Sequence, residues 1–137
     1  MIKYVVGFLF NQDKTEVVLI KKNRPDWQKG FLNGVGGKIE GDETPEMAME
    51  REFEEEAGLK IKVWRDFCEI RDYNENYIVY FFYAVYEHLN DVVSRTDEKI
   101  IILNSDDLYK LKVIPNLRWL IPMCKDEYHR YSKTYTN

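Results

Sequence analysis

One stretch of the chain, residues 37–59, carries the strongest local signals: GKIEGDETPEMAMEREFEEEAGL. Thr44 offers the side-chain oxygen that a helix N-cap needs, and Pro45 suits the first helical position, where no N–H is required. Gly58 stands where a left-handed cap ends a helix. The stretch therefore predicts a helix from Pro45 to about Ala57.

This helix is unusually acidic, with glutamates at 43, 46, 50, 52, 54, 55 and 56. At 3.6 residues per turn, the apolar stripe that faces a core consists of Met49, Phe53 and Ala57. One flank of that stripe carries a cluster of three carboxylates: Glu52, Glu55 and Glu56. Such a cluster repels itself unless a cation fills it, and hard oxygen donors suit Mg²⁺ or Mn²⁺. Helix geometry alone leaves two interpretations open, a metal site and a solvated helix face.

The spacing of the whole stretch resembles the signature of the Nudix hydrolases. Gly37 is followed after five residues by Glu43, and after seven more by Arg51-Glu52-Phe53-Glu54-Glu55-Glu56-Ala57-Gly58-Leu59. Every fixed polar and glycine position matches, while Phe53 is aromatic where an aliphatic residue is commoner. The resemblance implies an α/β fold of α+β type, the α/β/α sandwich with a mixed central sheet, in one domain over residues 1–137. It also implies metal-dependent hydrolysis of a nucleoside diphosphate linked to another group.

The resemblance assigns roles within this stretch and just after it. The implied catalytic residues are Arg51, Glu52, Glu55 and Glu56, with Glu55 acting as metal ligand, general base or both. The implied ligands of Mg²⁺ or Mn²⁺ are Gly37, Glu52, Glu55, Glu56 and Glu98, the last from the Asp97-Glu98 loop. Arg51 either orients a carboxylate or pairs with Glu55 one turn on. Glu43 precedes the helix, where a carboxylate suits the helix dipole, so its role is either structural or catalytic. Asp97 and Glu98 are either part of the metal site or two solvated acidic residues of a loop.

Residues 33–38, Asn-Gly-Val-Gly-Gly-Lys, resemble the branch that hydrolyses nucleoside triphosphates, including oxidised purine forms. The substrate-binding candidates are Lys22, Phe31, Asn33, Lys38 and Asn116, with Trp27 and Trp119 as further stacking candidates. Asn33 either contacts the base or caps a glycine-rich turn, and Asn116 either contacts a purine edge or caps the last helix. The favoured reaction is cleavage of a (deoxy)nucleoside triphosphate to monophosphate and pyrophosphate. The alternatives are a dinucleoside polyphosphate, a capped RNA end, or binding of nucleotide without cleavage.

Outside this region, alternation and β-branched residues predict strands at 2–10, 16–22, 59–70, 77–87 and 99–103. Residues 33–37 are expected as a glycine-rich loop, 71–76 as a turn and 106–111 as a short helix. A final helix is expected after Pro115 to about Tyr128, followed only by a polar tail from about Arg130.

Composition narrows the class of protein. The 137 residues have a net charge of −4, which argues against a protein that coats nucleic acid. Two cysteines, Cys68 and Cys124, are too few for a disulfide framework and predict reduced core thiols in the cytoplasm. No run approaches the roughly 20 apolar residues of a membrane helix, and the apolar run 5–10 is too short for a signal peptide. We therefore expect a cytoplasmic enzyme with a small nucleotide as partner, acting as a monomer or homodimer without a membrane.

Overall fold

The computed structural model describes residues 1–126 and 133–136, and it is built around one mixed sheet. The strands are β1 (Ile2–Phe10), β2 (Glu16–Lys21), β3 (Leu32–Asn33), β4 (Val35–Lys38), β5 (Arg65–Asp72), β6 (Tyr77–Val85), β7 (Ile100–Asn104) and β8 (Lys133–Thr136). The helices are α1 (Pro45–Ala57) and α2 (Leu117–Lys125), with short 3₁₀ turns at Asp26–Gln28, Leu89–Asp91 and Leu108–Lys110. Among these residues, no helix is long and apolar enough to cross a membrane.

The strand order is β3-β2-β1-β6-β5-β8, with β4 added to β1 and β7 added to β2. β1 runs parallel to β6 along its whole length, from Ile2 opposite Tyr77 to Phe10 opposite Val85. β5 pairs parallel with β8, whereas the other strand pairs are antiparallel. The expected mixed sheet is therefore confirmed.

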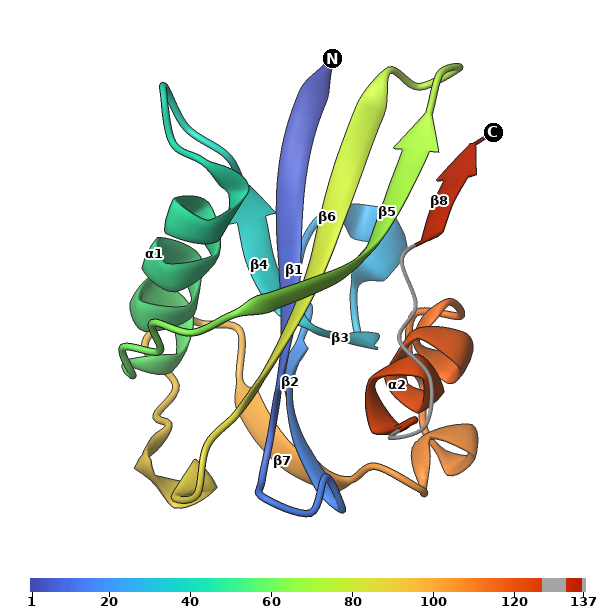
Figure 1. Cartoon of the computed structure of the whole chain (residues 1–137). Coiled ribbons are helices and arrows are strands. Elements are labelled where there is room, and N and C mark those ends of the chain that lie inside the picture. Colours follow the sequence, from blue (N-terminus) through green and yellow to red (C-terminus); the bar gives the residue numbers. More distant parts are fainter. Residues whose placement is uncertain (127–132, 137) are drawn as a thin grey trace.

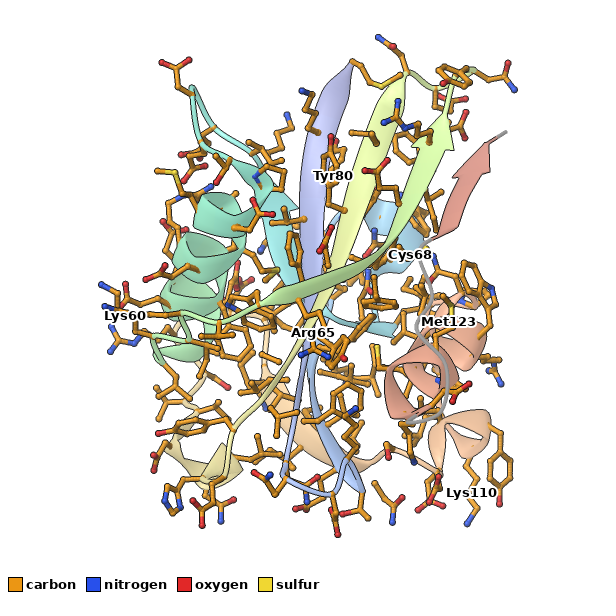
Figure 2. All side chains as sticks on the ribbon, in the orientation of Figure 1. Lys60, Arg65, Cys68, Tyr80, Lys110 and Met123 are labelled. Carbon is orange, nitrogen blue, oxygen red and sulfur yellow. The ribbon has the colours of Figure 1, made fainter. Side chains whose placement is uncertain are left out.

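The two helices cover opposite faces of the sheet (Figure 1). Because side chains alternate along a strand, Val5 and Leu9 of β1 pack with Met49 of α1, and Phe8 of β1 packs with Leu117 of α2. In Figure 2, Cys68 and Met123, which belong to the α2-side core, lie on the other side of the molecule from Lys60, just beyond α1. The α/β/α layering implied by the resemblance is thus observed.

The glycine-rich segment is a strand and not the loop that was expected. β4 pairs antiparallel with β1, with Val5 opposite Gly37 and Val6 opposite Gly36. A Cβ on Gly36 would lie 1.9 Å from the Val5 carbonyl oxygen, so the glycine permits a close approach of two strands. Gly34 and Gly36 permit close packing against β1, whereas the sequence had suggested a loop.

Four other expectations were also wrong in part. The strand expected at 59–70 begins only at Arg65, because the preceding segment folds onto α1, where Trp64 packs at 5.2 Å from the ring of Phe53. The helix expected at 106–111 is a single 3₁₀ turn. Lys133–Thr136 is a strand and not only a polar tail, since β5 offers backbone partners whatever the polarity of the added strand. The last helix ends at Lys125, and Tyr128 and Arg130 lie outside the described residues.

Candidate active site

Helix α1 begins and ends where its caps dictate, and this fixes the rotation of its glutamates. The Thr44 hydroxyl accepts a hydrogen bond from the Met47 N–H at 3.2 Å, and Gly58 adopts a φ of 71°. The stripe Met49, Phe53 and Ala57 is completely buried against the sheet. The flank of α1 that carries Glu52, Glu55 and Glu56 is therefore held at the edge where α1 meets β4.

Glu52 is a buried carboxylate that lies against the backbone of Gly37. A Cβ on Gly37 would lie 2.5 Å from the Glu52 Oε1, so no other residue fits at this position without displacing the carboxylate. Burial raises the pKa of Glu52, Arg51 opposes this rise, and the neighbouring charges of Glu55 and Glu56 add to it. The structure thus brings together two of the expected metal ligands.

Arg51 joins several of the carboxylates through its guanidinium. It donates to both oxygens of Glu43, at 2.6 and 2.8 Å, and to Glu52 Oε1 at 2.9 Å. Its contacts with Glu55 are longer, at 3.3 and 3.4 Å, and a further bond reaches the Lys38 carbonyl at 3.0 Å. The structure therefore contains both interactions considered for Arg51, with the bidentate pair directed to Glu43.

Glu43 has a structural place in this network. Its Oε1 also accepts the Glu40 N–H at 2.9 Å, and the hydrogen bonds from Arg51 lower the pKa of Glu43. Glu55 is different, because its side chain is 57% exposed and holds only the long contacts with Arg51. Of Glu43, Glu52 and Glu55, which all bond to Arg51, Glu55 has the side chain most open to solvent.

Glu56 meets a segment far along the chain that precedes β7. The Thr96 hydroxyl donates to Glu56 Oε2 at 3.2 Å, and the Arg95 N–H donates to the Glu56 carbonyl at 3.2 Å. Burial raises the pKa of Glu56, and the charges of Glu98 and Glu55 add to the rise. Figure 1 shows this segment passing the end of α1 on its way to β7.

Glu98 is 3% exposed and makes three bonds to the segment after β2. Its Oε1 accepts from Lys22 Nζ at 3.1 Å, and its Oε2 accepts the N–H groups of Asn23 and Arg24 at 2.6 and 3.2 Å. Although burial acts to raise it, the pKa of Glu98 is lowered by these donors. Glu98 therefore lies close enough for its charge to act on Glu56, but its carboxylate bonds to residues 22–24.

The carboxylates do not converge on one point. Within residues 1–126 and 133–136, no three His, Cys, Asp or Glu side chains are arranged to hold a metal ion. Glu52 is bonded to Arg51 and Glu56 to Thr96, which separates like charges. The residues nonetheless fit a divalent cation by their chemistry, because the donors are all hard oxygens and Gly37 has no Cβ that would displace the Glu52 carboxylate.

A second group of candidates lies where β3 meets the segment before α2. Leu32 bonds to both neighbours of Val113, donating to the Lys112 carbonyl at 2.8 Å and accepting the Ile114 N–H at 2.9 Å. This pairing brings Asn33 beside the start of α2. The Asn33 amide donates to Gln28 Oε1 at 3.2 Å, and its Oδ1 accepts the Gly34 N–H at 2.8 Å.

Asn116 occupies the N-cap position of α2 without capping it. Its side chain makes no cap hydrogen bond, and its Oδ1 is buried without a hydrogen-bond partner among the described residues. The expected alternative of an ordinary N-cap is therefore not what the structure shows. A buried acceptor without a donor is uncommon and asks for an explanation, such as a donor on a ligand.

The remaining candidates are dispersed. Lys22 is committed to Glu98, Lys38 is exposed, and Trp27 is 67% exposed. Phe31 packs at the edge of the α2-side core, with Lys112 Nζ 4.5 Å from its ring centre. Lys112, Gln28 and Thr96 could not be predicted from sequence. They contact Phe31, Asn33 and Glu56, and such contacts leave no local pattern in the sequence.

Comparisons with known proteins agree with this fold. A family model described as NUDIX domain matches residues 1–119. A structure of MutT, from work on Aliivibrio salmonicida and Vibrio cholerae, is similar with a TM-score of 0.70 and 24% identity, over 88% of this chain and 96% of that one. The structure of the MutT protein of Bacillus halodurans has a TM-score of 0.73 and 17% identity, over 99% of this chain and 88% of that one. The NUDIX domain of Shewanella oneidensis NrtR, solved with ADP ribose, has a TM-score of 0.74 and 17% identity, over 88% of this chain and 83% of that one. No curated protein matches.

Proposed function

The chain belongs to the NUDIX domain family and is a Nudix hydrolase, and from this premise we propose that its substrate is a (deoxy)nucleoside triphosphate. The products are the nucleoside monophosphate and pyrophosphate, and an oxidised purine is included among the bases. Nudix hydrolases generally use divalent metals, and we propose Mg²⁺ or Mn²⁺ here. The observation that carries the proposal is the placement of Glu52, Glu55 and Glu56 along one edge of α1, with Glu52 seated against Gly37.

The metal-binding residues that we propose are Gly37, Glu52, Glu55 and Glu56. A divalent cation there would neutralise the polyphosphate and lower the pKa of a bound water molecule. Glu98 is left out of this set, because both of its oxygens already accept hydrogen bonds from residues 22–24.

Arg51 holds the carboxylates in place and does not contact the reacting atoms. Its guanidinium fixes Glu43 and Glu52 relative to each other with short, charge-assisted bonds. Glu55 is the general base in this proposal, since its exposed carboxylate holds only long contacts and can take a proton from water. Because the attacking water must lose that proton, we expect activity to rise at alkaline pH.

The base would be recognised at the other end of the site. Asn116 offers a buried acceptor that lacks a donor, and Asn33 lies on the neighbouring strand with its amide already oriented by Gln28. A purine edge carries both donors and acceptors, which amide groups match. Phe31 supplies an apolar surface nearby. Of the two candidate lysines, Lys22 is paired with Glu98, so we assign the phosphate to Lys38, the exposed residue at the end of β4.

A nucleotide-sensing role is the second candidate. The NUDIX domain of NrtR, similar in fold, was solved with ADP ribose. Modules that bind without cleaving typically lose a carboxylate of the signature, whereas this chain keeps Glu52, Glu55 and Glu56. The retained glutamates favour hydrolysis.

A hydrolysis screen tests the proposal. The purified protein is incubated with Mg²⁺ or Mn²⁺ and a panel of normal and oxidised triphosphates, dinucleoside polyphosphates, ADP-ribose and capped RNA, and products are identified by chromatography. We expect monophosphate and pyrophosphate, so a phosphate assay responds only when pyrophosphatase is added. Binding of a nucleotide without any product would favour the sensing role instead. The Glu56→Gln protein, purified in parallel, controls for contaminating phosphatases.

A further inference from the structure

The turn Thr96-Asp97-Glu98 lies between the glutamates of α1 and the segment after β2. Thr96 reaches Glu56 of α1 with a hydrogen bond of 3.2 Å. Asp97 accepts hydrogen bonds from the side chains of Asn23 and Arg24. Glu98 binds the N–H groups of the same two residues. Three consecutive side chains thus connect two parts of the site that are distant in sequence.

Thr96 is oriented by the turn itself. Its Oγ1 accepts the Glu98 N–H at 3.2 Å, so the hydroxyl proton is directed away from that donor. Two acceptors lie within reach of the hydroxyl proton, and the Glu56 carboxylate at 3.2 Å is closer than the Glu98 carbonyl at 3.5 Å. A hydroxyl that accepts on one side and donates on the other fixes the rotamer of the carboxylate it meets.

Glu98 fixes the start of a closed loop, residues 22–31. The two ends of this loop are joined, because the Lys22 N–H donates to the Phe31 carbonyl and the Gly30 N–H to the Lys22 carbonyl, both at 2.8 Å. Glu98 holds the same end through the N–H groups of Asn23 and Arg24. Phe31, whose carbonyl accepts the Lys22 N–H, is therefore linked to the Glu98 carboxylate through Lys22.

We propose that the turn 96–98 positions both halves of the site, with Thr96 orienting Glu56 for hydrolysis and Glu98 holding the loop 22–31 for nucleotide binding. This inference rests on the proposed function and gives Glu98 a different role from the metal ligand expected from sequence. Both are positioning residues, and their effects separate: Thr96 acts on kcat and Glu98 on KM.

The Glu98 arm is tested with Glu98→Ala and the isosteric Glu98→Gln, which retains one acceptor oxygen and so guards against loss of folding. In Glu98→Ala we expect KM for the preferred nucleotide to rise about tenfold or more with kcat within about threefold, and a smaller rise in Glu98→Gln. Amide hydrogen exchange of Asn23 and Arg24 should accelerate in the metal-free protein. Glu87→Ala is the matched control, because Glu87 is an exposed glutamate in the same segment between β6 and β7. This variant should change neither KM nor the hydrogen exchange of Asn23 and Arg24.

Binding of Mn²⁺ to the nucleotide-free protein separates the two roles of Glu98. Positioning predicts that Glu98→Gln binds Mn²⁺ within about twofold of wild type. A loss of tenfold or more with unchanged exchange at Asn23 and Arg24 would make Glu98 a ligand and overturn the proposal. If the wild type hydrolyses no nucleotide, the proposed function fails, while hydrogen exchange and Mn²⁺ binding still test this arm.

The Thr96 arm uses Thr96→Val, which keeps the shape and removes the hydroxyl, and Thr96→Ser, which keeps the hydroxyl. We expect kcat to fall about three- to tenfold in Thr96→Val at unchanged KM, because one exposed hydrogen bond is lost. Thr96→Ser should recover most of kcat. Equal turnover of Thr96→Val and wild type, or equal loss in both variants, would refute the role of the hydroxyl.

Discussion

Replacement of Arg51 by methionine removes the cation from the carboxylate network and keeps much of its apolar volume. In the wild type the Arg51 side chain is 24% exposed, and its guanidinium binds Glu43 twice and Glu52 once, at 2.6 to 2.9 Å. The variant leaves Glu52, which is 8% exposed, without its compensating charge. The metal-free protein should therefore lose stability.

The magnitude follows from the burial of the pair. Removal of one partner of a fully buried ion pair costs about 3–5 kcal/mol, whereas an exposed pair contributes roughly 0–1 kcal/mol. The Arg51 network lies nearer the first limit, so we expect a loss of about 2–4 kcal/mol. In a domain of this size 1 kcal/mol shifts Tm by roughly 3–5 °C, which gives a fall of about 6–20 °C.

The loss should depend on pH. Burial raises the pKa of Glu52 in the folded state and Arg51 opposes the rise, so removal of Arg51 raises it further. A carboxyl whose pKa is raised by folding binds protons more tightly in the folded state, and its penalty grows as pH rises through that range. Glu43, whose pKa Arg51 lowers, contributes stability above its unfolded pKa that is lost as pH falls. The Glu52 effect makes the difference between variant and wild type larger at pH 8 than at pH 5, whereas the Glu43 contribution is lost only below the unfolded pKa of that group.

The assay is thermal unfolding followed by circular dichroism, with EDTA, at both pH values. Arg71→Met is the matched control, since Arg71 pairs with Glu69 at 3.1 Å on the more exposed β5. An equal fall of Tm for Arg51→Met and Arg71→Met, or a fall independent of pH, would refute the compensation of buried charge.

Three further predictions concern the site. Glu56→Gln should lose at least about 100-fold in kcat without a lower Tm in EDTA, because burial already raises the pKa of Glu56; unchanged turnover would contradict its role as a ligand. Gly37→Ala should lower kcat/KM by about 100-fold, since its Cβ would displace the Glu52 carboxylate. A wild-type rate would show that the position of this carboxylate against Gly37 is not needed for activity. Asn33→Ala and Asn116→Ala should each cost about 1–3 kcal/mol in kcat/KM for the preferred base and little for a poor one; a uniform loss on purine and pyrimidine triphosphates would point to a structural role.

Local signals predicted the helix that carries the chemistry from end to end. Thr44, Pro45 and Gly58 set the bounds of α1 because a cap acts on atoms within one turn of itself. The apolar stripe then fixed the rotation of the helix, so Glu52 could be placed at the core edge from sequence alone. Burial of Glu52 confirms that part of the expectation.

Features that depend on distant segments were not predictable in this way. Gly36 resembles a turn glycine in sequence, and only the approach of the Val5 carbonyl explains it as part of a strand. The contact of Thr96 with Glu56 joins segments forty residues apart. The unsatisfied oxygen of Asn116 is likewise set by packing around the start of α2, whereas sequence suggested a cap.

The parallel pairing of β1 with β6 has a consequence for biosynthesis. Ile2 lies opposite Tyr77 and Phe10 opposite Val85, so the first strand made lacks its longest partner until more than half of the chain has been synthesised. At roughly 5–20 residues per second, the apolar segment of β1 spends several seconds exposed on the nascent chain. Pairing over such separations also slows folding. The edge of β1 that faces β6 is therefore completed late, whereas β2 and β4 can pair with the other edge of β1 much earlier.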